Sequence, residues 1–150
     1  AGMAGLRAAE ALALLQERCH TAYETLSSDQ EGLSEIHHAA TYQRENSLKR
    51  AVAWNAFSMV ALSKTADTHH IGRKRGSIAA ALSEIQARTM VIGINSDHLF
   101  PVSEQRYLAE KIPGAVFREI QSDKGHQAWQ TETSRLKHLL KLFLEGETHA

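Results

Sequence analysis

The spacing of hydrophobic and polar residues divides the sequence into a helical front and an alternating back. Residues 6–15 form an Ala/Leu-rich run of good helix formers without a breaker, which predicts a helix. The polar run at 27–32 predicts a surface loop, and a short helix is expected over 33–42. The first third of the chain is therefore expected to be mostly helical.

A second apolar pattern occupies the next part of the sequence. Its apolar residues recur at helical spacing, in a segment that also holds Trp54 and Met59: Leu48, Val52, Phe57, Val60 and Ala61. The pattern predicts one amphipathic helix whose apolar face needs a partner surface and is usually part of a core. The glycine-flanked run 72–76 breaks this pattern, and Ser77 is a candidate N-cap for a short helix over 78–85.

The pattern changes after Arg88. Residues 89–94 form a short continuous apolar run, which is typical of a strand buried on both faces of a parallel sheet. The elements expected after it are a loop at 95–101, a helix at 102–111, a strand at 115–120, a loop at 121–125 and an amphipathic helix containing Leu136, Leu139, Leu140, Phe143 and Leu144.

This order of elements predicts an α/β fold with two parallel strands. We expect a helical segment at 1–88, followed by a strand-helix-strand-helix unit at 89–150. Two strands are too few for a stable open sheet. The sheet is therefore expected to be completed by further chain or by a partner molecule.

Composition and charge exclude several classes of protein. The 17 basic and 17 acidic side chains give a formal net charge of zero, which argues against nucleic acid as a partner. A hydrophobic content of 43% is too high for intrinsic disorder, and no apolar run approaches the ~20 residues that span a membrane. A single Cys cannot form an intrachain disulfide, which favours a reduced, cytoplasmic protein. Because the chain starts with Ala1 and enters a helical pattern at once, we expect it to begin inside a longer protein.

Two residues suited to acid–base chemistry occupy the loops after the two predicted strands. Asp97 and His126 are 29 residues apart, the length of one crossover unit, and parallel strands bring such loops to one edge of a sheet. A carboxylate there can hold one imidazole N–H while the other nitrogen takes a proton from a nucleophile. The alternative is that Asp97 forms a turn and His126 has no catalytic role.

The residues around this pair resemble a known family. The run 88–101, with Glu104-Gln105 and Gly125-His126, is similar to the C-terminal part of homoserine O-acetyltransferases, which have the α/β-hydrolase fold. Four earlier segments resemble the helix that leads into the helical lid of that family and the lid itself: 5–9, 42–44, 55–58 and 72–76. The resemblance thus covers nearly the whole chain.

The resemblance implies a Ser-His-Asp triad, with Asp97 as the acid and His126 as the base. It implies transfer of an acetyl group from acetyl-CoA, as co-substrate, to the hydroxyl of homoserine in methionine biosynthesis. The nucleophile's Gly-x-Ser-x-Gly elbow is absent: Ser34 has a glycine on one side only and is expected to be a loop or cap residue. We therefore expect the chain to need the N-terminal half of the fold and to be inactive alone.

Three positions depart from the family pattern. Where the family holds homoserine with an Arg, a Tyr and an Asp, this sequence has Glu10, Glu17 and Gln127, so Gln127 is a candidate substrate-binding residue. Replacing a guanidinium with a carboxylate repels a substrate carboxylate. An acceptor of different charge, or an esterase that uses water, is the alternative.

A third hypothesis is not catalytic. The chain would then be a truncated fragment, or an association module whose lid helices form a homodimer through the apolar face around Trp54 and Phe57.

Three other features carry weaker signals. The adjacent histidines at 37–38 and 69–70 point in divergent directions, so no metal site is predicted. The basic residues at 73–75 could meet the phosphates of an acyl-CoA, but are more often solvated surface. Cys19 is expected to pack in the first helix.

Overall fold

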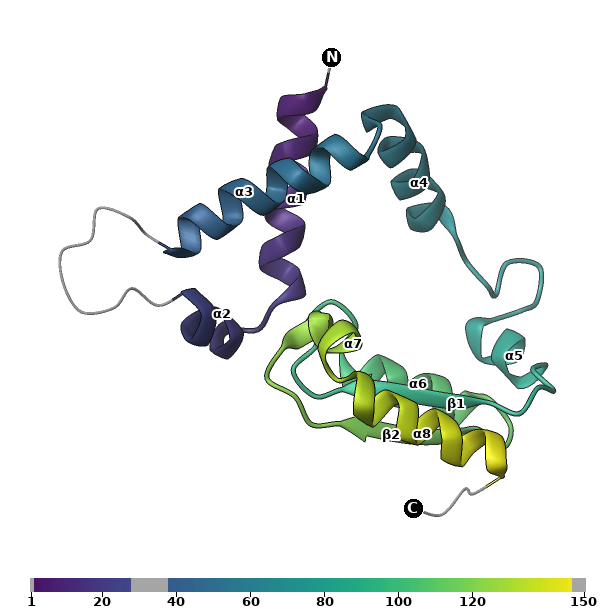
Figure 1. Cartoon of the computed structure of the whole chain (residues 1–150). Helices are drawn as coiled ribbons and strands as arrows, with labels where there is room; N and C mark the ends of the chain where they lie inside the picture. The colour runs from purple at the N-terminus through teal and green to yellow at the C-terminus, as the bar shows by residue number, and fades with distance from the viewer. Residues whose placement is uncertain (1, 28–37, 147–150) are drawn as a thin grey trace. The chain divides into compact units, whose positions relative to one another are not determined.

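A computed structural model describes residues 2–27 and 38–146 (Figure 1). Contacts within the chain divide it into two compact units, residues 1–69 and 70–150. The sequence-based division after residue 88 separates helical from strand-bearing sequence and stays a prediction. Among the described helices, none combines the length and the apolar character that crossing a bilayer requires.

Unit 1 is helical over its described residues. Its helices are α1 (Met3–Glu17), α2 (His20–Ser27), α3 (His38–Ala53) and α4 (Ala56–Thr68). The helix predicted at 6–15 is confirmed within α1. Ser27 ends α2, and the rest of the predicted loop lies outside the described residues, as do the first five residues of the helix expected at 33–42.

The single amphipathic helix predicted across residues 48–61 is wrong. The chain forms α3 and α4 there, and the break falls at Asn55, whose backbone is extended with φ −95° and ψ 128°. The Asn55 side chain accepts hydrogen bonds from the backbone N–H groups of Phe57 at 3.0 Å and Ser58 at 3.2 Å. Asn55 is therefore an N-cap, which starts a second helix and lets the chain change direction.

The apolar face of these two helices is not the core that its pattern suggested. Its large side chains are exposed to solvent in the described structure: Leu48, Val52, Trp54, Phe57, Val60 and Leu62. The residues that α3 buries are instead the small Ser47 and Ala51. Because small side chains allow two helices to approach closely, α3 crosses directly over α1 (Figure 1). The buried residues of α1 include Leu6 and Leu14.

Unit 2 contains the predicted alternation of strands and helices. Its elements are α5 (Ile78–Ser83), β1 (Met90–Ile94), α6 (Val102–Lys111), β2 (Val116–Ile120), a 3₁₀ turn η1 (Gly125–Gln127), α7 (Ala128–Thr131) and α8 (Thr133–Glu145). The strands pair in parallel, from Met90 opposite Val116 to Ile94 opposite Ile120. The N-cap role of Ser77 is confirmed, since its hydroxyl accepts the Ala80 N–H at 3.0 Å.

Helices cover both faces of the two-stranded sheet, with α8 in front of the strands and α6 behind them in Figure 1. The buried centre on the α8 side consists of Ile94, Ile120 and Ala128, against which Leu136 and Leu139 pack. On the α6 side Gly93 leaves room for the Phe117 ring, because a Cβ atom at this position would lie 3.2 Å from the ring and would require it to shift slightly. The two strands end in register, with Ile94 opposite Ile120, so the loops that follow them leave from the same edge of the sheet.

Candidate active site

Asp97 is fixed in the loop that follows β1. Its backbone N–H donates to the carbonyl of Ile94 at 3.1 Å, which closes a tight turn directly after the strand. Its side chain is 2% exposed. One carboxylate oxygen, Oδ1, accepts the backbone N–H groups of Leu99 at 2.9 Å and Phe100 at 3.0 Å. The Asp97 carboxylate is thus fixed by hydrogen bonds within its own loop, through Oδ1, and Oδ2 is left for a contact with another element.

His126 reaches the same carboxylate from the loop that follows β2. Its Nδ1 lies 2.8 Å from Asp97 Oδ2. Because an ionised carboxylate only accepts, Nδ1 carries the hydrogen and Nε2 is the nitrogen that can take a proton. The ring also contacts Phe100, with ring centroids 5.2 Å apart at a tilt of 54°. The structure therefore brings together the two residues that the sequence placed at adjacent strand ends.

Two neighbours of Asp97 also cross to the loop of His126. Asn95 Oδ1 accepts the backbone N–H of Ser122 at 2.7 Å, and Ser96 Oγ accepts the backbone N–H of Gly125 at 3.0 Å. These contacts were not predicted, although Asn95 and Ser96 adjoin Asp97 in the sequence. The only signal for them was that both carry short polar side chains at the end of a buried strand.

A cleft of about 380 Å³ opens beside the pair. Its walls are mainly apolar, and its lining residues are Ile92, Gly93, Ile94, Asp97, Phe100, Gln105, Leu108, His126 and Trp129. None of these described lining residues is Ser, Thr or Cys, so the nucleophile that the pair would serve is not among them. The arrangement can orient an imidazole and move a proton at the mouth of an apolar cleft.

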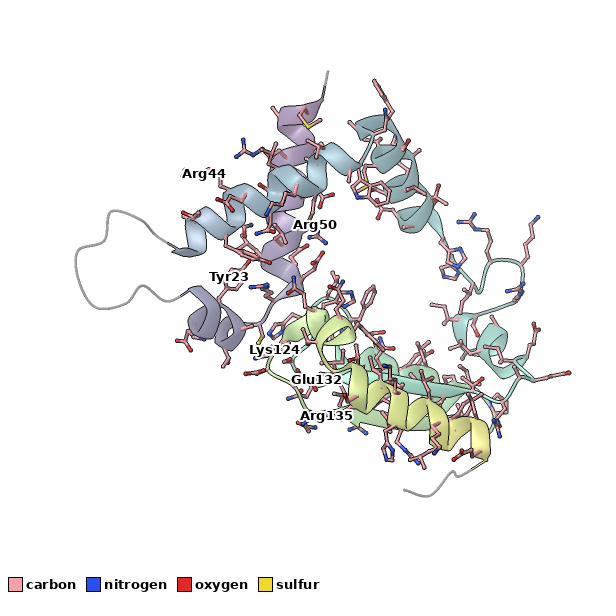
Figure 2. All side chains as sticks on the ribbon, viewed as in Figure 1. Tyr23, Arg44, Arg50, Lys124, Glu132 and Arg135 are labelled. Atoms are coloured by element: carbon pink, nitrogen blue, oxygen red, sulfur yellow. The ribbon has the colours of Figure 1, made fainter. Side chains whose placement is uncertain are left out.

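The remaining residues singled out in the sequence are Gln127, Ser34, Glu10 and Glu17. Gln127 follows His126 in η1, is half-buried, and stays a candidate for binding substrate. Ser34 lies outside the described residues. Glu10 and Glu17 lie on α1 and pair with Arg50 of α3, which is labelled in Figure 2. Arg50 Nη2 is 2.7 Å from Glu17 Oε1, and Arg50 Nε is 3.6 Å from Glu10 Oε2.

Electrostatics in unit 1 follow from this clustering. The hydrogen bond to Glu17 raises the pKa of the Arg50 guanidinium above its ordinary value, although burial opposes the shift. Burial raises the pKa of the Tyr23 phenol, whose Oη lies 3.1 Å from both the Leu14 carbonyl and Gln43 Oε1.

In unit 2, the hydrogen bond from Lys124 lowers the pKa of the exposed Asp123 carboxyl.

The weaker sequence signals have plain structural locations. Cys19 is buried, but it lies between α1 and α2 and not within the first helix, because the helix ends at Glu17. The basic run 73–75 is exposed in a turn before α5. Across the part of the chain that the structure describes, no three His, Cys, Asp or Glu side chains are grouped closely enough to hold a metal ion.

Comparison with solved structures identifies the class of fold. The chain matches a homoserine O-acetyltransferase from Bacillus anthracis with a TM-score of 0.83 and 20% identity, over 99% of this chain and 43% of that one. It matches esterase E22 with a TM-score of 0.80 and 19% identity, over 96% of this chain and 43% of that one. The chain has the fold of the C-terminal part of an α/β hydrolase.

Comparison of sequences identifies homologues of the chain. No family model matches the sequence. The chain is nevertheless 37% identical to a homoserine O-acetyltransferase of Cyclobacterium marinum over 95% of its length, 41% identical to one of Thermobifida fusca over 69%, and 35% identical to one of Thermus thermophilus over 93%. It spans 41%, 28% and 36% of the lengths of those relatives. The chain is a homologue of the homoserine O-acetyltransferases.

Proposed function

We propose that this chain supplies the acid and the base of a Ser-His-Asp triad in an acyltransferase. The observation that carries the proposal is the 2.8 Å contact between His126 Nδ1 and Asp97 Oδ2 beside an apolar cleft. Its relatives are named homoserine O-acetyltransferases, so the proposed reaction is transfer of an acetyl group from acetyl-CoA to the hydroxyl of an amino acid.

In the proposed reaction His126 moves one proton in each of two steps. Nε2 first takes the proton of the serine hydroxyl, which attacks the thioester carbonyl, and then gives that proton to the departing thiol. The acceptor hydroxyl next attacks the acyl-serine and loses its proton to Nε2, which returns it to the serine. Asp97 stays ionised throughout and stabilises the imidazolium that forms in each step.

The serine itself comes from outside these 150 residues, which contain no Gly-x-Ser-x-Gly elbow. Among the described strands, β1 pairs with β2 alone, and the cleft runs along β1 past Ile92 and Ile94. We propose that the sheet continues at this side of β1 with a strand from the nucleophile-bearing part of the fold. The chain alone is then inactive, because the proton acceptor has no nucleophile to serve.

The test is to join the chain to a nucleophile-bearing part and to measure thiol release from acetyl-CoA. His126→Ala is expected to lower the rate at least about a thousandfold, since the residues of a triad act as a unit. His98→Ala is the matched control, because His98 is exposed in the same loop as Asp97 and its loss is expected to leave the rate unchanged. An unchanged rate in His126→Ala contradicts the proposal.

The identity of the acceptor is a finer part of the proposal. Arg50 pairs with both Glu10 and Glu17, which stand where the family pattern has an Arg and a Tyr. A carboxylate in place of that guanidinium repels the carboxylate of an amino-acid acceptor. We propose an acceptor that differs in charge from homoserine, or water, as in an esterase. Thiol release that rises with an added hydroxyl compound indicates transfer, whereas release that ignores every acceptor indicates hydrolysis.

A second candidate function is association through the face formed by Leu48, Val52, Trp54, Phe57, Val60 and Leu62. Phe57 is 79% exposed and α4 buries none of its residues, so a second copy of the chain could cover this face. Light scattering is expected to show a dimer that Phe57→Ser disrupts. Leu144→Ser is the control, because Leu144 is 73% exposed on α8 of the other unit. A monomer before any substitution excludes this function.

A further inference from the structure

The loops after β1 and β2 are joined by three contacts from three consecutive residues. Asn95 Oδ1 accepts the Ser122 N–H, Ser96 Oγ accepts the Gly125 N–H, and Asp97 Oδ2 accepts from His126. The first two contacts hold backbone, and only the third holds the imidazole ring. A ring held at one nitrogen alone can still move with its backbone, so the contact to Gly125 bears on the geometry of His126.

We propose that Ser96 is a positioning residue for His126: by accepting the Gly125 N–H, its hydroxyl fixes the backbone from which the imidazole reaches Asp97. Gly125 directly precedes His126, so the two residues share a peptide unit. Ser96 acts on the ring only through the backbone of Gly125, so its role is positioning and not catalysis. The inference rests on the proposed function of His126 as the base.

The backbone of Gly125 needs an acceptor that its own segment does not provide. Gly125 begins η1, and Lys124 before it makes no side-chain cap hydrogen bond. Gly125 is buried and has a φ of 63°, the left-handed region that glycine occupies without strain. A buried N–H at the start of a helical turn is costly without a partner. Ser96 supplies that partner from the neighbouring loop at 3.0 Å.

Asp97 cannot compensate if Gly125 shifts. Its Oδ1 is held by the N–H groups of Leu99 and Phe100, and its own N–H is held by Ile94. The carboxylate therefore stays in place while the backbone of His126 moves. Loss of the Ser96 hydroxyl is therefore expected to lengthen the distance between His126 Nδ1 and Asp97 Oδ2, because His126 moves and Asp97 does not.

The test is ¹⁵N NMR of the full 150-residue chain, with the His126 signals assigned by their loss in His126→Gln. In the unsubstituted chain we expect one tautomer, with the hydrogen on Nδ1. Ser96→Ala is expected to mix the two tautomers and to speed hydrogen exchange at the Gly125 amide about tenfold or more. Ser96→Thr keeps the hydroxyl and is expected to preserve the single tautomer, since Ser96 is only half-buried.

Ser122→Ala is the matched control. Ser122 Oγ accepts the Lys124 N–H at 3.2 Å, so this variant loses a serine-to-backbone bond in the same loop without touching Gly125. It is expected to leave the His126 tautomer unchanged. The inference is overturned if Ser96→Ala keeps the single tautomer, if Ser122→Ala mixes the tautomers equally, or if a folded Ser96→Thr chain loses it.

If Ser96→Ala does not fold, Ser96→Cys tests the same bond, because a thiol is a weak acceptor of similar size. Partial mixing of the tautomers in Ser96→Cys supports the inference. A single tautomer in Ser96→Cys overturns it. The result is separate from that of the proposed function. An active His126→Ala enzyme would end the catalytic role of His126, whereas a tautomer that depends on Ser96 would still show that the serine positions the ring.

Discussion

The two units differ in what fills their interiors. The buried centre of unit 2 is aliphatic, with Ile94 and Ile120 at its middle. Unit 1 buries Leu6 and Leu14 as well, but beside them it buries Ser47 and the carboxylate of Glu10, while its largest apolar side chains face solvent. Both units bury apolar side chains, but unit 1 adds a buried carboxylate that pairs across α1 and α3.

The largest difference is expected from removing one side chain at the centre of unit 2. Ile94 is 1% exposed, so Ile94→Ala leaves a cavity and is expected to lower the free energy of unfolding by about 3 kcal/mol. Val60→Ala on α4 removes an exposed side chain and is expected to change it by less than about 0.5 kcal/mol. Urea unfolding followed by circular dichroism measures both. Equal losses would contradict the burial of Ile94 and the exposure of Val60 as the source of the difference.

A smaller effect is expected at the polar centre of unit 1. Arg50→Met leaves the buried carboxylate of Glu10 without its cation and is expected to cost about 2 kcal/mol, discounted because Arg50 is partly exposed. The double variant Arg50→Met/Glu10→Gln is expected to recover part of this loss, because no buried charge then remains unpaired. Helix content against urea concentration measures both chains. A single variant as stable as the unsubstituted chain would show that unit 1 does not depend on the pair.

Each unit has a helix that begins with a side-chain N-cap, Asn55 in unit 1 and Ser77 in unit 2, so loss of the cap can be compared between them. Asn55→Ala and Ser77→Ala each remove a side-chain acceptor at a helix start, for which about 1 kcal/mol is typical. Because α4 buries no residue, loss of Asn55 is expected to unwind the start of α4 alone, whereas α5 buries Ala81 and Leu82 and stays helical. Amide hydrogen exchange measures each helix. Unwinding of α5 and not α4 would reverse the expectation.

The smallest effect is a pH dependence confined to unit 1. Burial raises the pKa of Tyr23 above 10.0 in the folded chain, while in the unfolded chain the phenol keeps its ordinary value. The unfolded chain thus releases the proton first, so the stability of unit 1 is full below pH 10.0 and falls as the pH rises through the folded pKa. Tyr23→Phe is expected to flatten this fall in urea unfolding across that range. An identical fall in both chains would assign it to other groups.

Most of unit 2 could be predicted because its signals are local. The apolar run that becomes β1, the bounds of α6 and the cap at Ser77 each depend on a few adjacent residues. The meeting of Asp97 with His126 followed from topology, since loops after adjacent parallel strands leave from one edge.

The errors have physical reasons. Asn55 stands among helix formers, and only its extended backbone reveals that it starts a new helix. The pairing of Arg50 with Glu17 joins residues 33 apart on different helices, and no local pattern indicates such a contact. The same holds for Ser96 and Gly125, which are 29 residues apart. Side-chain contacts between elements depend on packing, which periodicity along one element does not report.

The pairing of β1 with one described strand has a consequence for the handling of this polypeptide. A strand with unpaired N–H and C=O groups along one side is a template for aggregation, and the apolar cleft beside β1 adds to that hazard. Co-expression of these 150 residues with the nucleophile-bearing part, whose strand is proposed to pair with β1, is therefore expected to yield more monodisperse protein.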